Sequence, residues 1–300
     1  MKTGIWLEKM ELPNLVKLAK KKISTRSLSK EATLGGTYLT KKKGRGMEFA
    51  EARPYQLGDD VRYIDWRVTA RSGRTHTKLF REERERPVIL VIDQSIPMFF
   101  GSRNKLKSVQ SAHIASLLGW HALLRGDRVG GVLFSEKIHR EFIPRADKRN
   151  YLGFLSNIMT EHNLVVDRMN EGGWNFNSKT LFSDVLLRVR RLAQPGSLIH
   201  ILSDFSGFNT ECRKQLFQIS KHNDVKSYLI YDPLEKEIKK SGLYAMSDGN
   251  KTGLVNTVKS DLRKKYKDIF EKHLDEIKSE FRLCRVNLKI ITTVDNILEV

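Results

Sequence analysis

The sequence predicts an α/β protein in which a mostly parallel sheet is covered by helices on both faces. From residue 87 onward, short apolar runs typical of buried strands alternate with amphipathic stretches typical of helices. The strand runs are continuously apolar, a pattern typical of parallel strands buried on both faces. A polar, arginine-rich stretch precedes this alternation and predicts a small additional subdomain.

Three segments are expected along the chain. Residues 1–34 form a helical lead-in, because apolar side chains recur at helical spacing between Leu12 and Ala19. Residues 35–86 form a β-rich segment with many arginines and aspartates, in which extended stretches are joined by turns. Residues 87–300 form the α/β domain.

The elements of the α/β domain follow from the apolar pattern and its breakers. Strands are predicted over residues 88–92, 128–134, 137–143, 197–202, 225–231 and 286–292, with a hairpin over 243–255 that turns at Asp248-Gly249. Helices are predicted over residues 105–125, 150–159, 181–192, 211–221 and 260–282. Gly126-Asp127 and Pro195-Gly196 each end a helix and lead into a strand.

Composition narrows the class of protein. A formal net charge of +19 predicts attraction to an acidic protein, an anionic membrane or nucleic acid. The basic residues are spread along the chain, which favours a solvated basic surface over a dedicated nucleic-acid site. Two cysteines without CxxC spacing argue against disulfides and zinc, and indicate the reducing cytoplasm. No signal peptide is expected, and no apolar run reaches the roughly 18 residues that cross a bilayer.

Two predicted strands end in a carboxylate that is followed by a hydroxyl. Asp93 and Ser95 follow the first strand, Asp204 and Ser206 follow a later one, and Thr180 opens a helix between them. Ligands of open α/β sheets bind at the carboxyl ends of strands, so these oxygens are expected to converge. Such oxygen ligands suit Mg²⁺. Each residue taken alone is equally explained as a turn former or a helix cap.

The order of these residues resembles the metal-ion-dependent adhesion site of the von Willebrand factor A domain. That site uses D-x-S-x-S, then a Thr, then an Asp, which implies Asp93, Ser95, Thr180 and Asp204 as metal ligands here. Pro97 stands where the second serine would be and offers no side-chain oxygen. The resemblance therefore implies a degenerate site that holds Mg²⁺ weakly or not at all.

The segment "GRGMEFAEARPYQLGDDVRYIDWRVTARSG", residues 44–73, resembles the signature of the bacterial domain-of-unknown-function 58 family. The resemblance continues through "GDRVGGVLF" and "DPLEKEI…SGLYAMSDG". Members of this family carry a von Willebrand A-like domain and are associated with MoxR-type AAA+ ATPases. The resemblance implies a MoxR-type ATPase and other von Willebrand A proteins as partners, together with peripheral association with membrane proteins. Nucleic acid is not the expected partner.

Acids, bases and aromatics alternate within this signature, and three interpretations remain open. One is a hydrogen-bonded network in which arginines bridge carboxylates. Another is a partner-docking surface centred on Trp66 and the arginines. The third is a catalytic pair such as Asp59 with Asp65. In an extended conformation, Arg62 and Trp66 would share one face. The candidate partner-binding residues are Arg53, Tyr55, Asp59, Arg62, Asp65, Trp66 and Arg71.

These observations predict a cytoplasmic, non-enzymatic adaptor, and the family resemblance implies that it acts with the ATPase in complex assembly or stress response. It is expected to bind its partner through the face that carries Asp93, Ser95, Thr180 and Asp204. No GxSxG, HExxH or Walker A motif is present, so most enzyme classes lack support. A nucleic-acid-binding protein and a metal-assisted hydrolase are the alternative functions.

Overall fold

The computed structural model describes residues 4–21, 47–82, 85–171, 182–238, 242–247, 252–258 and 260–299. The chain divides into two compact units. One unit, Arg26–Glu85, is called the signature unit below, and the other, Met1–Thr25 with Arg86–Val300, is called the α/β domain. The predicted boundary after residue 34 lies outside the described residues. The first residues join the α/β domain because Leu7, Leu12 and Ala19 are buried in its core.

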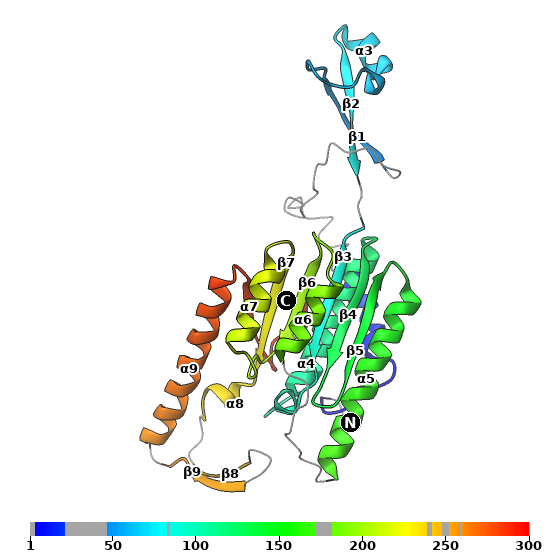
Figure 1. Ribbon diagram of the computed structural model, residues 1–300. Coiled ribbons are helices and arrows are strands. Elements are labelled where there is room, and N and C mark those ends of the chain that lie inside the picture. The colour runs from blue at the N-terminus through cyan, green and yellow to red at the C-terminus, as the bar shows by residue number, and fades with distance from the viewer. Residues whose placement is uncertain are drawn as a thin grey trace. The chain divides into compact units, whose positions relative to one another are not determined.

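Six strands form the central sheet of the α/β domain in the order β10-β7-β6-β3-β4-β5 (Figure 1). Their bounds are β3 (Pro87–Asp93), β4 (Arg128–Phe134), β5 (His139–Arg145), β6 (Leu198–Ser203), β7 (Asp224–Tyr231) and β10 (Asn287–Thr292). All neighbouring pairs are parallel except β4 with β5, which is antiparallel. The predicted α/β class with a mostly parallel sheet is confirmed.

Helices cover both faces of this sheet. The longer ones are α4 (Lys107–Leu124), α5 (Lys148–Asn170), α6 (Phe182–Leu192), α7 (Thr210–Ser220) and α9 (Ser260–Leu283), and the short ones are α1 (Glu11–Asn14) and α8 (Pro233–Lys236). Successive side chains of β3 point to opposite faces, so Leu90 packs with α4 and α5 while Val91 packs with α6 and α7. This double burial explains why the strand is continuously apolar.

Two further features complete the α/β domain. The predicted hairpin is present as β8 (Leu243–Ser247) paired antiparallel with β9 (Thr252–Asn256), and its predicted turn at Asp248-Gly249 lies outside the described residues. Short 3₁₀ turns, η2 (Ile96–Phe99) and η3 (Ile297–Glu299), follow β3 and β10. Among the described residues, every helix is too short or too polar to cross a membrane.

The signature unit is a hairpin whose connection is partly helical. Strand β1 (Met47–Pro54) pairs antiparallel with β2 (His76–Glu82), and between them lie η1 (Val61–Tyr63) and α3 (Trp66–Ser72). The extended conformation predicted around Trp66 is therefore wrong. The reason is local capping, because Asp65 accepts hydrogen bonds from the first amides of α3 and Gly73 ends the helix at a φ of 68°.

Candidate functional site

The sheet order reverses between β3 and β6, and this position defines the candidate site. The two strands lie side by side and run parallel, with Ile92 opposite Leu202. From β3 the chain adds β4 and β5 on one side, and later adds β7 and β10 beyond β6 on the other. Asp93 and Asp204 follow at the carboxyl ends of these two strands. The two aspartates lie at one edge of the sheet, because Ser203, which directly precedes Asp204, donates its hydroxyl to Asp93.

Asp93 is held by hydroxyl and amide donors. Its side chain is buried, and Oδ1 accepts from the backbone N–H of Ser95 at 2.8 Å while Oδ2 accepts from Oγ of Ser203 at 2.5 Å. Burial, and then the charge of Asp204, raises the pKa of Asp93 to about 7. Folding therefore favours the protonated form of Asp93 more than water does. Ser203, the last residue of β6, was not singled out by the sequence.

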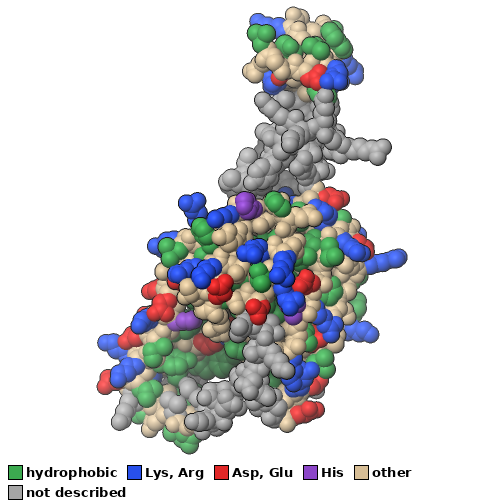
Figure 2. Space-filling view, viewed as in Figure 1, with side chains coloured by type: hydrophobic (Ala, Val, Ile, Leu, Met, Phe, Trp, Pro, Cys, Tyr) green, Lys and Arg blue, Asp and Glu red, His purple; other side chains and the backbone are tan. Residues whose placement is uncertain are grey.

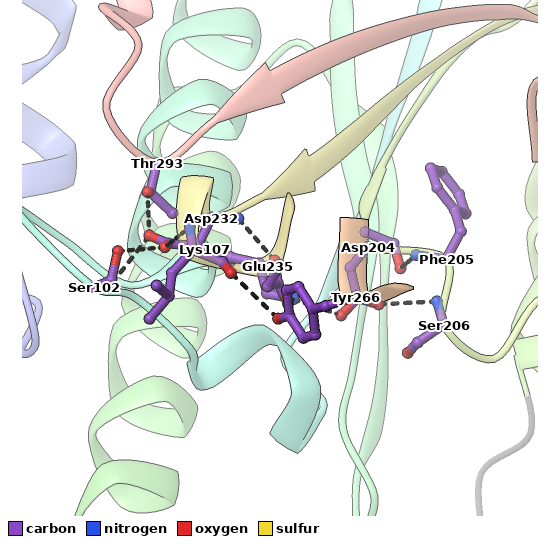
Figure 3. A network of polar contacts seen from close by, with 11 residues as sticks. Ser102, Lys107, Asp204, Phe205, Ser206, Asp232, Glu235, Tyr266 and Thr293 are labelled. Atoms are coloured by element: carbon purple, nitrogen blue, oxygen red, sulfur yellow. Dashed lines mark hydrogen bonds and ion pairs between the residues drawn. The ribbon is translucent and has the colours of Figure 1, made fainter. Parts of the chain in front are cut away.

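A buried lysine lies beside Asp204. Lys107, the first residue of α4, is only 2% exposed, and its Nζ lies 2.8 Å from Oδ2 of Asp204 and 2.7 Å from Oε1 of Glu235 (Figure 3). Burial acts to lower the pKa of Lys107, but Asp204 and Glu235 outweigh it and raise that pKa overall. Lys107 therefore carries a full positive charge between two carboxylates.

The two carboxylates respond differently to the same ammonium group. Burial acts to raise the pKa of Asp204, but the charge and hydrogen bond of Lys107 lower it overall. Burial also raises the pKa of Glu235, and there Lys107 only partly offsets the effect. The pKa of Asp204 is thus lowered overall and that of Glu235 is raised overall, although both carboxylates bind the same ammonium.

Asp232 binds three loops at the edge of the sheet where the parallel strands end, which is called the rim below. It lies after β7 and caps α8, with Oδ1 accepting from the N–H of Leu234 at 2.9 Å while Glu235 accepts from the N–H of Asp232 at 2.7 Å. It also accepts from the amide and hydroxyl of Ser102 and from the hydroxyl of Thr293 (Figure 3). Asp232 and Glu235 belong to the "DPLEKEI" stretch of the sequence, so this motif anchors the rim.

A cavity of about 140 Å³ opens next to Lys107, Asp204 and Glu235. Its other walls include the rings of Tyr231 and Phe270, whose centroids lie 5.1 Å apart. Figure 2 shows a hollow with hydrophobic side chains beside α9. The rim therefore combines an internally paired charge cluster with an apolar wall.

The structure describes two of the remaining residues that the sequence predicts at the rim. Ser95 lies beside Asp93 as expected, and its backbone amide binds that carboxylate. Ser206 donates its backbone N–H to Oδ1 of Asp204 at 3.0 Å. Thr180 lies outside the described residues. Among the residues that are described, no group of three or more His, Cys, Asp or Glu side chains is arranged to hold a metal ion.

Several signature residues bind one another within their own unit. Arg53 Nη2 donates to Oδ1 of Asp59 at 2.7 Å, and the hydroxyl of Tyr55 donates to the carbonyl of Asp59 at 3.2 Å. Arg62 is paired with Asp60 at 3.0 Å on the surface. These contacts agree with the interpretation as a hydrogen-bonded network.

Other signature residues face outward. Trp66 is 71% exposed, and Leu57 and Val61 are exposed as well. Arg71 is exposed and forms no ion pair with another described residue. The structure therefore separates the predicted partner-binding set into residues that hold the unit together and residues available to a partner.

A family model described as "Protein of unknown function DUF58" matches residues 51–276 of the chain. The chain belongs to the DUF58 family. The matched range includes the signature unit's outward-facing residues and, in the α/β domain, Asp93, Lys107, Asp204 and Glu235. The residues that build the rim thus lie within the family's shared region, except for Thr293.

This DUF58 protein is similar to uncharacterised proteins of Mycobacterium bovis and Mycobacterium tuberculosis. Each is 24% identical over 268 residues, which cover 88% of this chain and 80% of the relative. Among solved structures, it is similar to the conserved hypothetical protein BatB from Bacteroides thetaiotaomicron, with a TM-score of 0.43 and 14% identity over 70% of this chain and 91% of that one. An aerotolerance-related membrane protein from Bacteroides fragilis gives a TM-score of 0.42 and 13% identity over 71% and 94%.

Proposed function

We propose that this DUF58 protein is a non-enzymatic adaptor that binds an acidic protein partner through the outward-facing residues of its signature unit. The observation that carries the proposal is the exposure of Trp66 at the first position of α3, near arginines that are also exposed. A large indole that is 71% exposed gains most from being covered by another molecule. Trp and Arg are also the residues that dominate binding energy at protein interfaces.

Charge supports the choice of an acidic partner. Between residues 53 and 78 the sequence has six basic residues, counting Arg and Lys, and three acidic ones. The three aspartates are engaged within the unit: Asp59 with Arg53, Asp60 with Arg62, and Asp65 with the amides of α3. Arg67, Arg71 and Arg74 are exposed and have no ion pair with another described residue, so the positive charge faces outward. Figure 2 shows hydrophobic and basic side chains side by side on this unit.

The proposed partner is a MoxR-type AAA+ ATPase, as the family resemblance implies, with other von Willebrand A proteins as further members of the complex. We place this adaptor in the cytoplasm, where its two cysteines, both free and buried, would remain reduced. A non-enzymatic role is supported by the state of the rim acids. Asp204 and Glu235 are paired with Lys107, and Asp232 is saturated with donors, so these carboxylates serve internal contacts.

The test is a calorimetric titration of the full chain with a purified MoxR-type ATPase from the same organism. Trp66→Ala is expected to weaken binding by about 30-fold or more, which corresponds to a hot spot of about 2 kcal/mol. Arg71→Glu is expected to weaken binding as well, because the new carboxylate repels an acidic partner. This loss of affinity should grow as the salt concentration is lowered. Phe217→Ala, an exposed aromatic on α7, is the matched control and should bind as wild type does. Unchanged affinity for both Trp66→Ala and Arg71→Glu would contradict the proposed surface.

A further inference from the structure

We propose that Lys107 supplies, from within the chain, the positive charge that a divalent cation would supply at the carboxyl ends of β3 and β6, so that this rim works without a metal ion. The resemblance to the metal-ion-dependent adhesion site implies Asp204 as a ligand of that cation. In the structure, Asp204 already has a cation as its partner. The inference does not depend on which molecule the signature unit binds.

Each oxygen of Asp204 already accepts a hydrogen bond, and one of these donors is an ammonium. Oδ2 takes the ammonium of Lys107 at 2.8 Å, and Oδ1 takes the backbone N–H of Ser206 at 3.0 Å. A divalent cation bound to this carboxylate would lie a few ångströms from a buried ammonium. At such distances, like charges in a protein interior repel strongly, by several kcal/mol at an effective dielectric of about 20. The cation would therefore have to displace Lys107.

Displacement of Lys107 is opposed by its burial and its second partner. The side chain is 2% exposed, and its Nζ is also bound to Glu235 at 2.7 Å. Lys107 occupies the first position of α4, where the positive end of the helix dipole disfavours a cation. The two carboxylates offset the effect of that dipole on the ammonium.

The other implied ligands are likewise engaged by donors of this chain. Both oxygens of Asp93 accept hydrogen bonds, from Ser203 and from the amide of Ser95. Pro97, inside η2, contributes no side-chain oxygen. Mg²⁺ requires near-ideal octahedral geometry from carboxylates and waters. The described residues offer instead two carboxylates that are already bound by donors of this chain.

An ammonium group that belongs to the chain differs from a bound metal ion in one respect. It cannot dissociate, so the charge balance of the rim is independent of the concentration of divalent cations. Because Lys107 links the start of α4 to the end of β6 and to α8, the same contact ties three elements together. Stability and partner binding are therefore expected to be insensitive to chelators.

The test compares Mn²⁺ binding by the full chain and three variants, using calorimetry and thermal unfolding. Wild type is expected to show no binding at about 1 mM Mn²⁺, the weak end of protein sites for divalent cations, and no change with EDTA. Lys107→Met leaves Asp204 and Glu235 facing an empty cation position. It is expected to gain Mn²⁺ binding, with unfolding about 2–4 °C higher when Mn²⁺ is present.

Two controls assign that gain to the site. Lys105→Met removes a half-buried lysine two residues earlier, and this variant should behave as wild type does. The double variant Lys107→Met/Asp204→Asn should lose the gained binding. Wild type that binds Mn²⁺ and loses it in Asp204→Asn would overturn the proposal, and this arm decides the question even where Lys107→Met does not fold. A folded Lys107→Met variant that binds no Mn²⁺ would also overturn it.

Discussion

Ser203 donates its hydroxyl to Oδ2 of Asp93 over 2.5 Å, so the end of β6 holds the carboxyl group at the end of β3. The contact joins the two strands between which the sheet order reverses. Both side chains are buried, and the charge of Asp204 lies close by. The hydrogen bonds favour the charged form of Asp93, but burial and Asp204 oppose it more strongly, and the pKa rises to about 7.

Asp93→Asn is expected to remove part of the pH dependence of stability between about pH 4 and pH 7. An unfolded aspartate titrates near pH 4, whereas folded Asp93 has a pKa of about 7, so folding favours the protonated form. The resulting stability is fully present below about pH 4 and is lost as pH rises through 7. Within that window, wild type should lose up to about 1.4 kcal/mol per pH unit relative to Asp93→Asn.

Urea unfolding of both proteins at several pH values measures this difference. His162 and His200, whose pKa values burial lowers to about 4 and about 3, give the opposite slope as they become protonated. They are present in both proteins, so their effect cancels in the comparison. Parallel stability curves for wild type and Asp93→Asn would show that Asp93 is ionised throughout the range.

Asp204→Asn is expected to lower the free energy of unfolding by about 3 kcal/mol, because it leaves a buried ammonium with one carboxylate in place of two. Because Glu235 remains as a partner of Lys107, the expected loss is at the lower end of the range for removing one member of a buried ion pair. Denaturant unfolding at neutral pH measures the change. Glu211→Gln, which removes an acid from an exposed ion pair with Lys214, is the control and should leave stability unchanged. Equal stabilities of Asp204→Asn and wild type would mean that the pair is energetically neutral.

The sequence predicted the carboxylates of the rim but missed the cation between them. Asp93 and Asp204 could be found because each follows an apolar strand, and parallel strands place such residues at one edge. Lys107 lies 97 residues from Asp204 and 128 from Glu235, and only the packing of α4 brings them together. Local pattern carries no information on such contacts. The "DPLEKEI" stretch is part of the family resemblance, but its side chains acquire a role only in the folded domain.

Two errors in predicted secondary structure have identifiable causes. Helix α5 runs to Asn170 and not to residue 159, because polar His162 and Asn163 are bound within the domain. His162 Nε2 contacts the carbonyl of Ile5 at 2.7 Å, and Asn163 bonds the backbone of Leu7. Because these polar residues interrupt the apolar periodicity, a hydrophobicity pattern does not predict this part of the helix. In the signature unit the error was avoidable, since Asp65 before the run and Gly73 after it are helix-boundary signals.

Asp232→Ala is expected to destabilise the α/β domain by roughly 3–5 kcal/mol, because the buried carboxylate of Asp232 is the acceptor of several donors at once. The donors are the amide and hydroxyl of Ser102, the hydroxyl of Thr293 and the amide of Leu234. Asp232→Asn keeps one carbonyl acceptor and should lose less. Thermal unfolding measures both, with Asp268→Ala on the exposed side of α9 as the control. A loss for Asp232→Ala no larger than for Asp268→Ala would show that water replaces the missing carboxylate.

Asp65→Ala is expected to loosen α3 without unfolding the α/β domain. The carboxylate of Asp65 accepts from the amides of Arg67 and Val68 at 3.1 Å each, and removal of such a cap costs about 1 kcal/mol. Hydrogen exchange at those two amides should therefore accelerate about fivefold, while exchange in β3 stays unchanged. Asp65→Ser restores a capping oxygen and should exchange nearly as slowly as wild type.

Asp65→Ala also tests whether the residues that hold the signature unit together affect the residues that bind the partner. Trp66 is the first residue of α3, so a frayed helix start should also weaken partner binding, although Asp65 itself faces the helix amides. Asp65→Ala is thus expected to bind the ATPase less tightly than Asp65→Ser does. If exchange accelerates in Asp65→Ala while its affinity for the ATPase equals that of Asp65→Ser, the partner does not require an ordered α3, and Trp66 binds independently of the helix that presents it.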